Sequence, residues 1–179
     1  TTVDYLLYLL ATRQPHNAAP QQSLLHTVAF VEDRLRAVQV DLVRSQEKSP
    51  EIEIKLIRAH ILILYLTLDL TPKQYSRKFG QNALTTALAA YWQGPDKNTL
   101  DEVLALEVLM GITSHFEGDS HQHLLAPSTV VHYRRLSAET VGNLALFHWT
   151  LQLVSRIELG HWRIVLDNIS SYKGYFGML

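Results

Sequence analysis

Residues 23–45 read SLLHTVAFVEDRLRAVQVDLVRS, and this stretch has the pattern of one long amphipathic helix. Val31, Leu35, Val38 and Leu42 recur at intervals of three or four residues, which places them on one helical face. Charged residues of the same stretch fall on the rest of the surface. The pattern therefore predicts a helix that packs one apolar stripe against neighbouring helices.

The same periodicity continues on both sides of this stretch. Val3, Leu6, Leu7 and Leu10 predict a short first helix, and residues 14–22 (QPHNAAPQQ), which hold two prolines, predict a linker. Further helices are expected over residues 51–68, 81–92, 100–115, 128–135, 139–158 and 162–169.

Capping signals mark where several of these helices begin. Ser49-Pro50-Glu51 combines an N-cap residue, a proline at the first helical position and an acidic first turn. Thr71-Pro72 repeats this start signal, and Gly80 is expected to interrupt the helical structure that follows it. Thr99 and Glu102 have the spacing of a capping box. Short connections between successive helices predict an all-α array of stacked antiparallel pairs.

Composition supports this fold and excludes several classes of site. The chain has 179 residues, of which 47% are hydrophobic and 18% charged, with 30 leucines against 8 glycines and 6 prolines. It has no cysteine, which excludes disulfides, thiolate metal sites and cysteine nucleophiles. Apolar runs such as residues 61–66 are far short of the ~20 residues that span a bilayer, so no membrane insertion is expected. We expect one helical domain over residues 1–179, taken from a longer protein.

Several segments resemble a known family in the same order along the chain. Residues 30–38 (FVEDRLRAV), followed by Asp41, match the pattern F-x-x-D-R-x-R-A-[IV]-x-x-D of the GANP family, the germinal-centre-associated nuclear proteins and leucine-permease transcriptional regulators. Residues 2–7 (TVDYLL), 57–62 (IRAHIL) and 81–88 (QNALTTAL) resemble its flanking helices. Residues 157–166 (IELGHWRIVL) take the place of its C-terminal turn and helix.

The resemblance implies an α-helical domain related to PCI domains, with the winged helix of such domains missing from this chain. It implies a non-enzymatic scaffold of a nuclear complex that couples transcription to mRNA export or processing, located in the nucleus and at its envelope or pores. The implied partners are a second PCI-type subunit, a small acidic disordered protein, and mRNA or nuclear pore components. A subunit of a proteasome-lid, initiation-factor-like or centrosome-associated assembly is the alternative within the same fold.

The polar residues of the family motif have two interpretations. Phe30, Asp33, Arg34, Arg36 and Asp41 lie on one predicted helix, and Asp33 and Arg36 are three residues apart and within reach of each other. We favour an architectural role, in which the arginines and carboxylates tie this helix to its neighbours. The alternative is a contact surface for a partner.

Two basic segments suggest RNA as a second type of partner. Each places a tyrosine among cationic side chains, an arrangement that can stack a base and contact phosphates. The net charge of −1 argues against nucleic-acid binding by the chain as a whole. The residues concerned are Lys73, Tyr75, Arg77 and Lys78 in the first segment, and Tyr133, Arg134 and Arg135 in the second.

No catalytic constellation is present in the sequence. It contains no GxSxG, GxxxxGK[ST] or GxGxxG motif, so we expect neither enzymatic activity nor a cofactor. His115, Asp119, His121 and His123 offer metal ligands, but their spacing defines no geometry, and a solvated loop over residues 117–127 is the better interpretation. His60 and His148 have apolar neighbours and are expected in or near the core.

Overall fold

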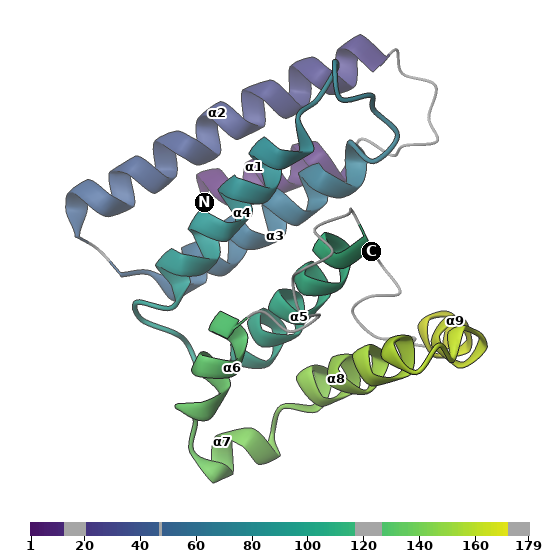
Figure 1. Cartoon of the computed structure of the whole chain (residues 1–179). Helices are drawn as coiled ribbons and strands as arrows, with labels where there is room; N and C mark the ends of the chain where they lie inside the picture. Colours follow the sequence, from purple (N-terminus) through teal and green to yellow (C-terminus); the bar gives the residue numbers. More distant parts are fainter. Residues whose placement is uncertain (13–20, 47, 117–126, 172–179) are drawn as a thin grey trace. The chain divides into compact units, whose positions relative to one another are not determined.

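A computed structural model describes residues 1–12, 21–46, 48–116 and 127–171. All of the regular structure in this part of the chain is helical, as the sequence predicts (Figure 1). The chain divides into two compact units, Thr1–Pro95 and Asp96–Leu179, and each is described by itself. The expectation of one domain stays a prediction. No described helix has the length and hydropathy needed to cross a bilayer.

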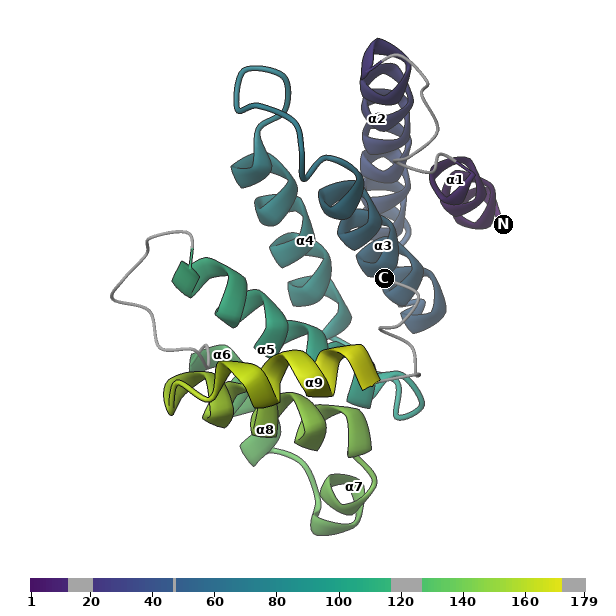
Figure 2. The same ribbon diagram turned by 90° about the vertical axis from the view of Figure 1, so that its right-hand side faces the viewer.

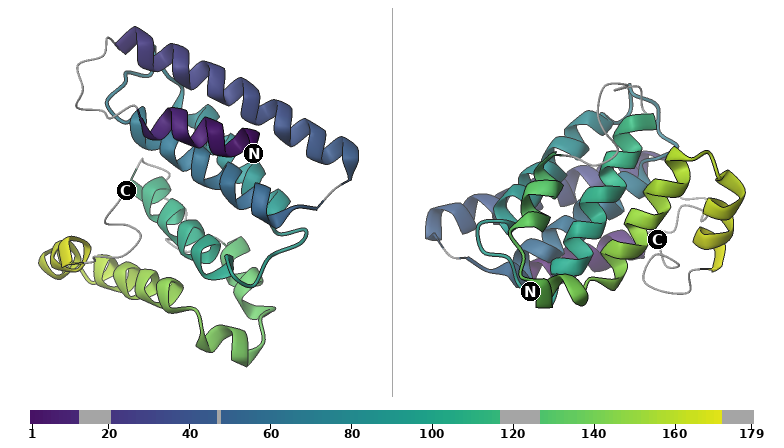
Figure 3. Two further views of the ribbon diagram at one scale, coloured as in Figure 1. Left: turned by 180° about the vertical axis from the view of Figure 1, so that it is seen from behind. Right: turned by 60° about the horizontal axis from the view of Figure 1, so that its bottom comes forward.

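The described part of the first unit contains four helices, which alternate in direction along the chain (Figures 1 and 2). The helices α1 and α4 both pack against α3, and α1 also packs against α2. Figure 3 shows α1 lying across α3 when the molecule is seen from behind. Their bounds are α1 Thr2–Ala11, α2 Gln21–Ser45, α3 Pro50–Leu66 and α4 Arg77–Tyr91.

The predicted apolar faces form the core of the first unit. Buried residues of α1, α2 and α3 belong to one cluster, and Leu7, Val38 and Leu42 pack at its edge. Burial of aliphatic side chains of this size contributes about 1.5–3 kcal/mol each. The cluster consists of Val3, Leu6, Leu10, Val28, Val31, Leu35, Leu56, Ala59, Ile63 and Leu66.

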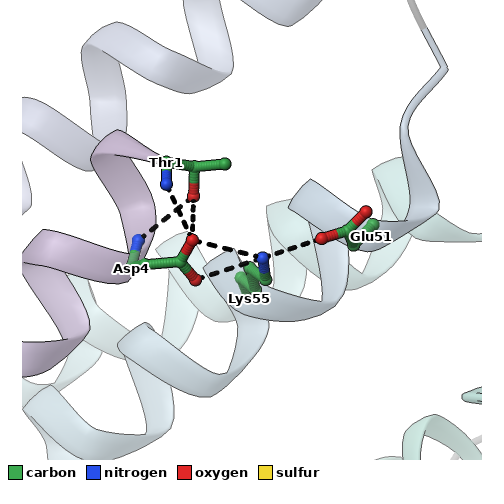
Figure 4. Close-up of polar contacts among 4 residues, drawn as sticks. All are labelled: Thr1, Asp4, Glu51 and Lys55. Carbon is green, nitrogen blue, oxygen red and sulfur yellow. Dashed lines mark hydrogen bonds and ion pairs between the residues drawn. The ribbon is translucent and has the colours of Figure 1, made fainter.

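An ion-pair network joins the beginning of α1 to the beginning of α3 (Figure 4). The Lys55 amine lies 3.1 Å from a carboxylate oxygen of Asp4 and 2.8 Å from one of Glu51. Hydrogen bonds, first from Thr1 and then from Lys55, hold the pKa of Asp4 well below its ordinary value. Because these carboxylates are largely exposed, the network orients α1 more than it stabilises the fold.

The fourth helix begins earlier than the sequence predicts. The Thr71-Pro72 signal produces a single turn, in which the Tyr75 amide bonds the Thr71 carbonyl, and α4 begins at Arg77. Gly80 lies inside this helix and is buried, so its expected role as an interruption is wrong. A Cβ atom on Gly80 would meet the Tyr75 hydroxyl at 2.6 Å and Leu64 Cδ2 at 2.8 Å. The glycine is therefore explained by the close approach of these neighbours.

The second unit is built on α5 and α8, which pack together, with α6 against α5 and α9 against α8 (Figure 3). Gly160, at φ +71°, ends α8 at the predicted position. The bounds are α5 Leu100–Phe116, α6 Pro127–Arg134, α7 Ala138–Gly142, α8 Ala145–Glu158 and α9 Trp162–Ser171.

The predicted single helix over residues 139–158 is wrong, because the chain forms two helices there. The break falls at Asn143 and Leu144, and Leu144 offers no side-chain cap to α8. Asp101, at the start of α5, supplies it: its carboxylate accepts the Leu146 and Phe147 amides at 2.9 and 2.7 Å. These are the amides that an N-cap residue normally binds, so a residue distant in sequence starts α8.

Candidate protein-interaction site

The polar residues of the FxxDRxRA motif lie mostly on the open face of α2. Phe30 is 50% exposed, and the side chains of Asp33 and Arg34 are 60% and 53% exposed. The Arg34 guanidinium pairs with the adjacent Asp33 carboxylate and lies 5.9 Å from the centre of the Phe30 ring. Asp41 is also exposed. Together these four side chains form what we call the α2 face.

The α2 face bears directly on the two interpretations of the motif. Among the described residues, the side chains of Asp33, Arg34 and Asp41 make no hydrogen bond or ion pair to another helix. The architectural interpretation therefore has no supporting contact at these three positions. Phe30 and Arg34 belong to residue types that are enriched at protein interfaces, and both are exposed on this face.

Arg36 is the motif residue that does reach a neighbouring helix. Its guanidinium lies 5.4 Å from the centre of the Phe79 ring on α4, a cation–π distance. Arg36 and Phe79 also line a cavity of 30 Å³ with Glu32 and His60. His60 is only 4% exposed, in agreement with the expectation of a core position, and burial lowers its pKa to about 4.

Glu32, which lies between the fixed positions of the motif, forms a polar contact of the kind that we expected from the motif's arginines and carboxylates. It accepts a hydrogen bond of 2.7 Å from the Tyr75 hydroxyl, in the segment that leads to α4. Burial raises the pKa of Glu32, against the opposing effects of this bond and of the Arg36 charge. Burial and the same bond raise the pKa of Tyr75. Sequence reasoning missed Glu32 as a site residue, since its partner lies 43 residues away.

The first basic segment divides into internal and open residues. Tyr75 packs against the core of the unit and its hydroxyl is bound to Glu32. The Arg77 guanidinium donates to the Leu68 carbonyl. Lys73 and Lys78 are exposed. The two lysines are therefore accessible to a ligand, whereas the tyrosine contributes to packing within the unit.

The second basic segment has the same division. Tyr133 is half-buried, and its ring centre lies 5.1 Å from that of Phe147 on α8. Arg134 and Arg135 are exposed at the end of α6. The two segments belong to different compact units.

The suggested metal ligands lie outside the described part. Asp119, His121 and His123 fall in residues 117–126, and the His115 side chain is not described either. In the part that is described, no group of three or more histidine or acidic side chains is arranged to hold a metal ion.

A family model matches the greater part of the chain. The model described as the SAC3/GANP family matches residues 1–135. The chain belongs to the SAC3/GANP family. No curated protein and no solved structure matches it significantly.

The SAC3/GANP match includes helices α1 to α6 and with them the α2 face and both basic segments. Membership of the family points to a role in mRNA export complexes. The match ends before α7, so the resemblance of residues 157–166 to the family's C-terminal turn stays a prediction.

Proposed function

We propose that the chain is the helical module of a non-enzymatic scaffold that acts through protein contacts in nuclear mRNA export or processing. The observation that carries the proposal is the exposure of the α2 face within the matched family region. A motif used only for core packing would bury these side chains.

The mechanism is presentation of a rigid surface. Val28, Val31 and Leu35 are at most 1% exposed, and Glu32 is bound to Tyr75, so the inner side of α2 is held in place. The opposite side then presents Phe30 and the Asp33–Arg34 pair to a partner with little ordering cost. A charged surface of this kind favours specificity and a high association rate over raw affinity.

The proposed partners are a second PCI-type subunit and a small acidic disordered protein, in the nucleus and at its envelope or pores. The test is to tag the protein at its natural locus and identify what co-purifies, with and without ribonuclease. Recovery of a PCI subunit, a small acidic protein and pore components despite ribonuclease is the expected result. Recovery of a proteasome-lid, initiation-factor or centrosomal assembly instead would overturn the export role.

Direct RNA binding is the second candidate function, and the exposed Arg134–Arg135 pair favours it. Contacts of this type weaken steeply as salt rises. If the partners disappear with ribonuclease, RNA is the bridge and this pair is the leading site.

A further inference from the structure

A groove of 340 Å³ lies within the first unit, on the part of α2 that follows the family motif. It is formed by the C-terminal half of α2, the beginning of α3 and the end of α4. Polar side chains of Gln39, Gln46 and Thr86 line it alongside an apolar set. The apolar residues are Leu42, Val43, Leu56, Ala87 and Ala90.

Apolar residues of α2 continue beyond the core into the groove. Val31 and Leu35 are fully buried, Leu42 is partly buried, and Val43 is 78% exposed. Ala87 and Ala90 have small side chains, so a bound segment can approach α4 closely at this point. The groove therefore provides apolar surface for an occupant.

Glu53, in the first turn of α3, gives the groove a negative charge. It lines the groove, is only 8% exposed, and its buried Oε2 atom has no hydrogen-bond partner. Lys48 also lines the groove, and its amine donates to the Gln93 carbonyl at 3.1 Å. Burial raises the pKa of Glu53 despite the Lys48 charge. A carboxylate buried without a hydrogen-bond donor is costly, and a cation bound in the groove beside Glu53 offsets that cost electrostatically.

We propose that this groove binds an apolar segment of a partner protein that carries a lysine or arginine, whose cation pairs with Glu53. A volume of 340 Å³ accommodates only a few side chains, which suits a short peptide segment. The site is distinct from the α2 face and does not depend on the export role.

The test begins with the complete chain and a displayed library of random 12-residue peptides. Enriched peptides are expected to share one lysine or arginine between apolar residues. Synthetic copies are then titrated by fluorescence anisotropy, each beside a matched peptide with norleucine in place of the cation. The norleucine peptides should bind at least tenfold more weakly.

Variants of the chain locate the binding. Glu53→Gln and Ala90→Leu should each weaken binding at least tenfold, the first by removing the charge and the second by filling the groove. Ala89→Leu changes the exposed neighbour of Ala90 on α4 and Glu51→Gln removes an exposed carboxylate of the same α3 turn, so both controls should stay within twofold. Thermal melts confirm that each variant is folded.

The proposal is overturned if no peptide is enriched, if the enriched peptides lack a cation, or if Ala90→Leu leaves their binding unchanged. These outcomes leave the scaffold role standing, because that role is read from co-purification. Conversely, an unexpected set of co-purifying proteins does not affect the peptide result.

Discussion

Substitution of Gly80 by alanine is expected to destabilise the chain, although alanine is the better helix former. An added Cβ would lie 2.6 Å from the Tyr75 hydroxyl and 2.8 Å from Leu64 Cδ2. The tyrosine cannot easily retreat, because its hydroxyl is bound to Glu32. Overpacking of this kind costs about 1–3 kcal/mol, against a gain of about 0.5–1 kcal/mol in helix propensity. The net loss in free energy of unfolding should therefore lie between about 0 and about 2.5 kcal/mol, centred near ~1 kcal/mol.

A double-mutant cycle with Tyr75→Phe tests the cause of this loss. The single change Tyr75→Phe leaves the half-buried Glu32 carboxylate without its donor and should cost about 1–3 kcal/mol. It also removes the atom nearest to the new Cβ, so Gly80→Ala should cost at least ~0.5 kcal/mol less in this background.

The assay is urea unfolding at 25 °C, monitored by circular dichroism. The m-values of the variants must agree with that of the unaltered protein for the midpoints to report stability. Gly142→Ala is the matched control, because nothing lies within 4 Å of a Cβ at that helical glycine. It should be neutral or stabilising by up to ~1 kcal/mol. The reasoning is refuted if Gly80→Ala stabilises the chain like the control, or if the two substitutions are strictly additive.

Three further predictions follow from the buried and capping residues and from the second basic segment. Burial lowers the pKa of His60 to about 4. Between pH ~6.5 and about 4, this histidine therefore binds more protons in the unfolded protein than in the folded one. The free energy of unfolding should fall by about 3 kcal/mol as the pH drops through that window. Urea midpoints of His60→Leu should show a smaller fall, and an identical profile would contradict the assignment. Asp101→Ala removes the acceptor of two α8 amides and should lower the free energy of unfolding by about 1–2 kcal/mol, measured by thermal or urea unfolding. Asp101→Asn keeps a side-chain oxygen and should cost less. Equal stability of the unaltered protein and both variants would count against the cap. Arg134→Glu with Arg135→Glu should leave the melt unchanged, and loss of RNA binding in a filter or anisotropy assay would favour the RNA candidate.

Local periodicity was sufficient to predict much of the fold. Val3, Leu6 and Leu10 are buried as their spacing predicts, and α3 begins at Pro50 as its start signal predicts. These features depend on residues within one or two helical turns. Such information is present in any short window of the sequence.

The features that were not predictable depend on residues distant in sequence. The break before α8 is capped by Asp101, 45 residues away, and Leu64, about 16 residues before Gly80, closes over that glycine. The motif on α2 shows the same limit, since periodicity places Arg34 and Arg36 on a helix but does not say which one meets Phe79. Tertiary packing decides these points, and no local pattern records it.

We propose above that the α2 face is a contact surface of a family scaffold. Its most direct test is a tagged variant with Arg34→Glu and Asp41→Lys, compared with the unaltered protein by thermal melt and by quantitative co-purification with ribonuclease present. The free energy of unfolding of this variant should lie within about 0.5 kcal/mol of that of the unaltered protein, as for most surface changes, and at least one stable partner should be lost. Full recovery of every partner with a normal melt would contradict it, and a large drop in stability would restore the architectural interpretation.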